Sequence, residues 1–100
     1  MNINFEYHNA NSSRRLEAIA TEKIKKLINK YDFIVGTDVY FKGENTSSDS
    51  TGKICEFRIN IPGSTVFSEA NKGSFEAALS ETVKQVKMQL QKKKEKMQIH

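Results

Sequence analysis

Hydrophobic and polar residues alternate along four stretches of this chain, and the alternation predicts four β-strands. A period of two is typical of a strand with one buried face and one polar face. The four stretches are Met1–Tyr7, Val35–Lys42, Lys53–Ile61 and, more weakly, Ser64–Ala70. Gly43–Gly52 contains no apolar residue, so we expect a flexible loop there. Pro62-Gly63 is a turn signal that predicts a hairpin between the last two strands.

Two further stretches carry hydrophobic residues every three or four positions, which predicts two amphipathic helices. The first is Ser13–Tyr31, where Ser12 or Ser13 can cap the N-terminus. The second is Ser74–Met97, where Ser74 can act as the cap. The apolar side of this second helix is expected to consist of Phe75, Leu79, Val83, Val86, Leu90 and Met97.

The elements follow the order β-α-β-β-β-α over residues 1–100, a length that fits one small domain. The simplest arrangement that buries every apolar stripe is a single four-stranded sheet with both helices on one face. The expected fold class is therefore α+β. On the buried face of the second strand we expect Val35, Thr37, Val39 and Phe41.

Positive charge is concentrated in the two predicted helices. The whole chain carries a net charge of +4, yet Ser13–Tyr31 alone carries +4 and Lys84–Lys96 carries +5. The rest of the chain therefore carries −5. Two such helices packed side by side would form one basic surface, which is the electrostatic footprint of a protein that binds a polyanion.

Helical spacing places the basic residues beside the apolar stripes. On the first helix, one flank of the apolar stripe gathers Arg15, Lys23, Lys26 and Lys30. On the last helix, Lys84, Lys87 and Lys94 form a stripe with Gln91 between them, and Lys92 and Lys96 lie on the opposite flank. The candidate RNA-binding residues are Lys23, Lys26, Lys30, Lys84, Lys87, Lys92, Lys94 and Lys96.

Residues that support catalysis or metal binding are sparse. Cys55 is the single cysteine and shares the apolar face of its strand, so we expect a buried thiol and a reducing compartment. His8 and His100 are far apart, and no metal-ligand spacing or Gly-rich phosphate loop is present. We expect no enzyme activity, no cofactor, no metal and no small-molecule substrate. No apolar run approaches the roughly 20 residues of a membrane span, and no signal peptide is visible, which favours the cytoplasm.

Several segments, in order and at matching spacings, resemble the ribosome hibernation-promoting factors, a family also known as ribosome-associated inhibitors or sigma-54 modulation proteins. The similarity covers nearly the whole chain. It includes the run EKIKKLINKY at Glu22–Tyr31, the pair Glu69-Ala70, the pattern F-x-A-A-L at Phe75–Leu79, and the closing Q-L-x-K-x-K at Gln89–Lys94.

This resemblance implies a fold similar to a double-stranded-RNA-binding domain with an added strand. It also implies binding in the messenger and transfer RNA channel of the small ribosomal subunit, reversible silencing of idle ribosomes, and a monomer when free. The basic positions that match the family are Lys23, Lys26, Lys30, Lys92, Lys94 and Lys96. Lys84 and Lys87 join the same surface by helical geometry.

The chain departs from the family at the start of its last helix. An acidic D-D-M-Y or D-M-Y element is usual there, whereas this chain has Lys72–Glu76, and Met88 stands where a basic residue is common. These differences concern the contacts of the helix start, not the fold. The chain also ends with the helix, so it resembles the short form of the family, which lacks the second domain that pairs ribosomes.

Other readings of the same residues remain open. A lysine run at a helix end can be only a solvated surface, and Lys23 can simply lie along the apolar stripe. A basic two-helix surface also suits a general module for double-stranded RNA. A third hypothesis is a protein-interaction module that pairs through an exposed strand edge, for example with a transcription factor.

Overall fold

The computed structural model describes residues 2–97, and these residues form four strands and two helices. The elements are β1 (Asn2–His8), α1 (Arg14–Lys30), β2 (Gly36–Gly43), β3 (Lys53–Ile61), β4 (Ser64–Lys72) and α2 (Phe75–Met97). The predicted order β-α-β-β-β-α and the α+β class are therefore confirmed. The predicted element boundaries agree with the observed ones to within two residues.

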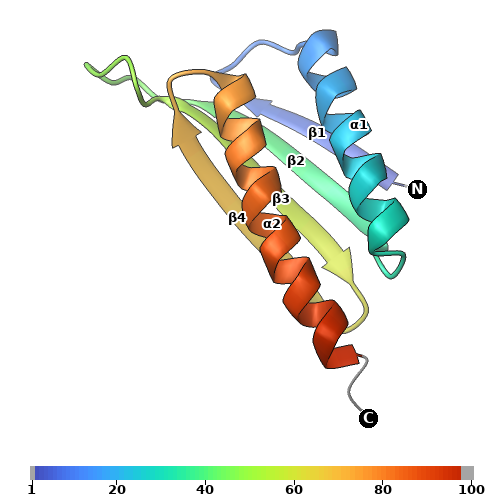
Figure 1. Ribbon diagram of the computed structural model, residues 1–100. Coiled ribbons are helices and arrows are strands. Elements are labelled where there is room, and N and C mark those ends of the chain that lie inside the picture. The colour runs from blue at the N-terminus through green and yellow to red at the C-terminus, as the bar shows by residue number, and fades with distance from the viewer. Residues whose placement is uncertain (1, 98–100) are drawn as a thin grey trace.

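The four strands form one mixed sheet in the order β1-β2-β3-β4. β1 and β2 are parallel because α1 carries the chain back between them, whereas β2, β3 and β4 are joined antiparallel. Both helices cover the same face of the sheet and run side by side in the same direction (Figure 1). Within the described residues, the opposite face of the sheet carries no helix.

The hydrophobic core lies between the sheet and the two helices. The registers place Phe5 beside Val39 and Val39 beside Phe57, so one row of apolar side chains crosses three strands. Phe41 links the two layers, because its ring stacks on Tyr7 at 5.5 Å and meets the edge of Phe75 of α2 at 5.6 Å between centroids.

Serine side chains begin both helices, as predicted. The Ser13 hydroxyl accepts a hydrogen bond from the Leu16 N–H at 3.1 Å, so Ser13 and not Ser12 is the cap of α1. The Ser74 hydroxyl accepts one from the Ala77 N–H at 3.2 Å. These bonds satisfy backbone donors that have no partner within the helix.

Two residues expected on the buried side are exposed. Val35 is 64% exposed, because it precedes Gly36, the first residue of β2 that pairs in the sheet. Met97 is 41% exposed, because the last turn of α2 extends past the end of the sheet (Figure 1). In both cases the hydrophobic pattern of the sequence extends past the last residue that other helices or strands bury.

The helix-free face of the sheet contains a buried carboxylate. Glu56 is only 2% exposed. Its oxygens accept hydrogen bonds from Lys42 Nζ at 2.5 Å and from Arg58 Nε at 2.7 Å. Burial alone would raise the pKa of Glu56, but the two cationic donors outweigh it and hold this pKa below its ordinary value. The ion pairs therefore compensate for the loss of hydration.

This cluster predicts how stability depends on pH. Glu56→Gln should lower the free energy of unfolding at pH 7 by about 1.5–3 kcal/mol, the contribution of a hydrogen bond to a charged group. Because the Glu56 pKa is lower in the folded state, the stabilisation is present above its unfolded pKa, near 4.3, and is lost as pH falls through the folded pKa. The deficit of the variant should therefore shrink below about pH 4.

Urea denaturation of both proteins between pH 3 and pH 7 measures this deficit. Glu44→Gln is a matched control, since Glu44 is exposed in the β2–β3 loop and loses the same charge. A deficit that stays constant over the whole pH range would contradict the assignment.

Candidate nucleic-acid interface

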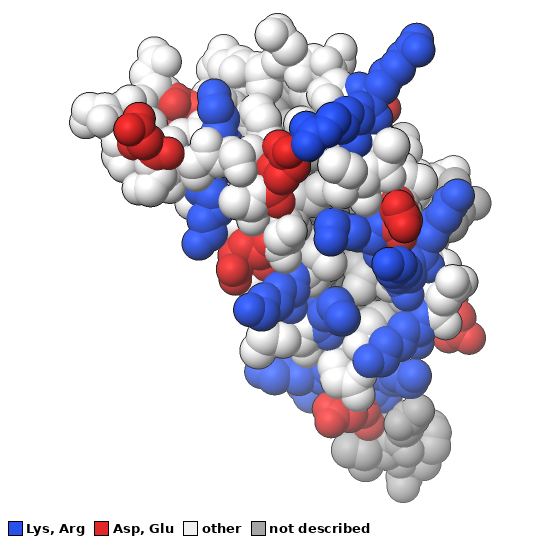
Figure 2. Space-filling view, turned by 45° about the horizontal axis from the view of Figure 1, so that its top comes forward, with Lys and Arg blue, Asp and Glu red and all other residues white. Residues whose placement is uncertain are grey.

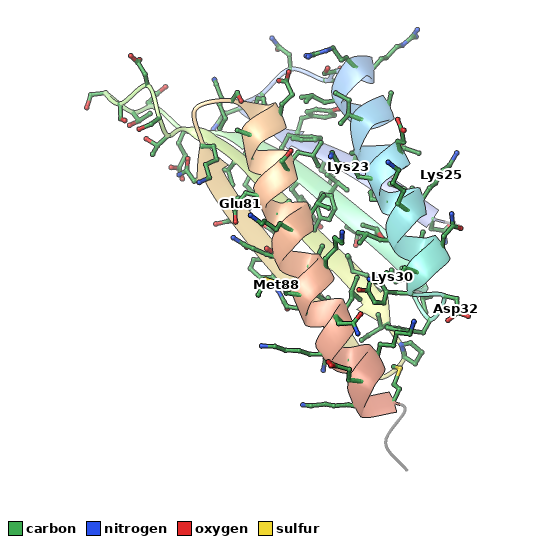
Figure 3. The ribbon with its side chains drawn as sticks, in the orientation of Figure 1. Lys23, Lys25, Lys30, Asp32, Glu81 and Met88 are labelled. Atoms are coloured by element: carbon green, nitrogen blue, oxygen red, sulfur yellow. The ribbon has the colours of Figure 1, made fainter. Side chains whose placement is uncertain are left out.

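The predicted basic flank of α1 faces the neighbouring helix. Lys23, Lys26 and Lys30 all line the groove between α1 and α2. Figure 3 shows Lys23 and Lys30 on the side of α1 that faces α2, whereas Lys25 points away from it. The apolar stripe of α1 positions these lysines, because Ile24 and Leu27 are buried against the sheet between them.

The lysine stripe of α2 faces α1 in return. Gln91, in the middle of the stripe, accepts a hydrogen bond from the Tyr31 hydroxyl at 3.0 Å. One turn on, Lys94 Nζ donates to the Lys30 carbonyl at 3.4 Å. Lys87 lies one turn before Gln91 and Lys84 one turn before that, so helical spacing places both on the same side.

Contacts join the two helices at both ends and leave a groove between. Near the N-terminal ends, Arg15 Nη2 pairs with Glu76 Oε2 at 2.5 Å. Near the C-terminal ends, Tyr31 bonds to Gln91. The groove between these contacts has a volume of about 340 Å³ and is lined by Lys23, Lys26, Leu27, Lys30, Tyr31, Val83 and Lys87. Its floor is apolar and its rim is basic.

Two of the eight candidate lysines lie elsewhere. Lys92 and Lys96 continue the side of α2 that carries Gln85 and Gln89. That side faces β4, because Gln85 accepts a hydrogen bond from Ser68 and Gln89 Nε2 donates to the Phe67 carbonyl at 2.8 Å. The structure therefore brings together Lys23, Lys26, Lys30, Lys87 and Lys94. Lys84 is exposed and related to Lys87 by helical spacing alone, and Lys92 and Lys96 lie on the opposite flank of α2.

The positive charge of this surface is not neutralised by nearby acids. Within residues 2–97, none of the eight lysines lies within 4.0 Å of a carboxylate; the ion pairs there involve His8, Arg15, Lys42 and Arg58. Figure 2 shows basic side chains dominating the helical face, with isolated acidic ones between them. A surface of ammonium groups without carboxylate partners attracts phosphate groups. No ion pair has to be broken when a phosphate replaces the water around these ammonium groups.

The five lysines beside the inter-helix groove, together with Lys84 and Gln91 of the same α2 stripe, are named the seam surface below. Sequence reasoning missed the contacts that shape it. Arg15 and Glu76 are 61 residues apart, and Tyr31 and Gln91 are 60 apart, so no local pattern connects them. The one usable signal was that Gln91 interrupts the lysine stripe of α2.

Other candidate chemistry is weaker. Cys55 is fully buried, and burial raises the pKa of its thiol to about 12, which suits a core residue and not a nucleophile. Over residues 2–97 the structure holds no group of three or more His, Cys, Asp or Glu residues that could bind a metal. No helix in the described part of the chain is long and apolar enough to cross a membrane.

A family model described as sigma 54 modulation protein / S30EA ribosomal protein matches residues 3–98. The chain belongs to this family. The resemblance noted in its sequence is thereby confirmed. Among curated proteins, no sequence gives a significant match.

Two solved structures have a similar fold. A ribosomal subunit interface protein from Coxiella burnetii superposes with a TM-score of 0.80 at 20% identity, covering 94% of this chain and 98% of that one. The N-terminal domain of Protein Y from Thermus thermophilus gives a TM-score of 0.76 at 18% identity, covering 92% and 98%. At such low identity these likenesses establish the fold alone.

Proposed function

We propose that this protein binds the small ribosomal subunit, occupies its messenger and transfer RNA channel, and holds the ribosome in an inactive, hibernating state. The observation that carries the proposal is the seam surface, a set of lysines that have no carboxylate partner within residues 2–97, on a chain of the S30EA family. The description of the Coxiella burnetii relative as a ribosomal subunit interface protein supports the same partner.

The mechanism follows from charge and shape. Lysine ammonium groups contact phosphates, and such contacts position a protein on RNA without reading its sequence. Specificity then comes from the fit of a rigid two-layer domain into folded RNA. A domain seated in the channel excludes messenger and transfer RNA by steric overlap, so inhibition needs no covalent chemistry and is reversible.

The distribution of charge also orients the protein during association. The two helical segments carry the positive charge, and the rest of the chain carries the compensating negative charge. An approaching RNA surface therefore attracts the helical face and repels the remainder. We infer that the protein acts in the cytoplasm, where ribosomes work, and that it arrives as a monomer.

A translation assay tests the proposal. Adding the purified protein to a reconstituted translation reaction should suppress protein synthesis in a dose-dependent manner. Raising the salt concentration should relieve the inhibition, because about six phosphate contacts would cost two or more orders of magnitude in affinity between low and moderate ionic strength. Unchanged synthesis at saturating protein would refute the proposal.

A further inference from the structure

The seam surface has an apolar floor that phosphate binding does not require. The apolar surface that a ligand can touch there comes mainly from Val83, which is half-buried and opens onto the groove, while Leu27 and Tyr31 lie almost fully buried beneath it. Lysines on a continuous polar surface would bind phosphates equally well. An apolar floor below a basic rim instead matches a ligand with an apolar face and a negative backbone.

We propose that the groove between α1 and α2 receives one unpaired nucleotide of an RNA strand, with its base on the floor and its flanking phosphates on the lysine rim. This inference rests on the proposed function, since it takes RNA as the partner, and it adds a seat for a single base. Bases in a duplex stack on their neighbours, so only an unpaired base can present its face to such a floor.

The groove has the size and the preformed shape for this ligand. Its volume of about 340 Å³ lies near the lower limit of sites that enclose small organic ligands, about 300 Å³. The contacts Arg15–Glu76 and Tyr31–Gln91 join the helices on either side of the groove, and the buried residues of both helices belong to one core with the sheet, so the groove is present before any ligand binds. The Tyr31 ring is held further by the ammonium groups of Lys30 and Lys94, at 5.5 Å and 5.8 Å from its centroid.

The positions of the lysines favour a strand over a free mononucleotide. Lys23, Lys26 and Lys30 line the α1 wall over two turns, and Lys87 lines the α2 wall. A nucleotide within a strand has a phosphate on each side of its base, so both walls can be engaged at once. A mononucleotide carries a phosphate group on one side only and can engage one wall.

The test compares two RNA hairpins of equal length, one fully paired and one with a single-nucleotide bulge. The wild-type protein should bind the bulged hairpin about tenfold more tightly, the size of one base contact. Val83→Phe fills the floor without changing charge. It should remove this preference and leave the affinity for the paired hairpin, and its salt dependence, unchanged.

Met88→Phe is the matched control, because Met88 is 62% exposed on the side of α2 away from α1 (Figure 3). This variant should retain the full preference for the bulge. Equal binding of the two hairpins by the wild type would overturn the nucleotide seat, and so would a Val83→Phe variant that still prefers the bulge.

Methyl NMR of the wild type tests the seat without any substitution. A single-stranded trinucleotide should shift the Leu27 and Val83 methyl signals through the ring current of the bound base, and inorganic phosphate should not. Equal shifts with inorganic phosphate would overturn the proposed nucleotide site. Equal affinities for adenosine monophosphate and for the trinucleotide would overturn the inference that the ligand is part of an RNA strand. Binding of the wild-type protein to small subunits, measured in parallel, separates the two proposals. If the protein does not bind small subunits, the proposed function is refuted. If it binds small subunits but does not prefer the bulged hairpin, only the nucleotide site is refuted.

Discussion

Replacing Lys26 and Lys87 together by glutamate is expected to weaken binding to the small ribosomal subunit by roughly 30- to 100-fold at physiological salt. The two residues stand on opposite walls of the groove, one on α1 and one on α2. Each substitution removes a phosphate contact and adds a negative charge beside the remaining lysines. The slope of log affinity against log salt should fall by about two, since two fewer counterions are released.

A second double variant with the same change in net charge controls for the weaker long-range attraction between the protein and ribosomal RNA. Lys25→Glu combined with Lys72→Glu alters two exposed lysines outside the groove. Lys25 lies on the outer side of α1 (Figure 3), and Lys72 is the last residue of β4. Its affinity should fall by less than about threefold. If both double variants lost affinity equally, net charge and not the seam surface would govern binding.

Truncating Phe41 is expected to have the largest effect on stability. Phe41→Ala should lower the free energy of unfolding by about 3–5 kcal/mol, the usual cost of removing a buried aromatic side chain. Phe41 is fully buried and contacts Tyr7 of β1 and Phe75 of α2, so its loss leaves a cavity between the two layers. A domain of this size has only about 5–15 kcal/mol in total, so the variant should be marginally folded.

Chemical denaturation measures the effect, and Phe67→Ala is the control. Phe67 lies on β4 and is 50% exposed, so its truncation should cost less than about 1 kcal/mol. A Phe41→Ala variant as stable as Phe67→Ala would show that the core is not organised around the Phe41 contacts.

The sequence was sufficient to predict the strands and helices, because each of them has one buried face and one polar face. A strand such as Lys53–Ile61 shows period two directly, since only one of its faces packs under the helices. Periodicity could not show where that cover ends, and for this reason Val35 and Met97 were wrongly expected on the buried side. Nor could it show that Glu56, on the helix-free face, is buried, because that burial is accompanied by an ion pair with Lys42 from a neighbouring strand.

The candidate site was partly predictable for the same reason. Helical geometry alone separated the stripe of Lys84, Lys87 and Lys94 from the flank that carries Lys92 and Lys96. The structure adds that the stripe faces α1, through the contacts of Gln91 and Lys94. The groove itself could not be predicted, because its shape depends on the spacing of two helices that meet at pairs of residues about 60 positions apart.

The central claim is that the protein occupies the messenger and transfer RNA channel, and a competition experiment tests it most directly. Equilibrium binding of the labelled protein is measured on empty small subunits, on empty large subunits, and on small subunits preloaded with messenger and transfer RNA. We predict tight binding to the empty small subunit alone, with loss of binding after preloading. Equal affinity for empty and preloaded small subunits would contradict the account.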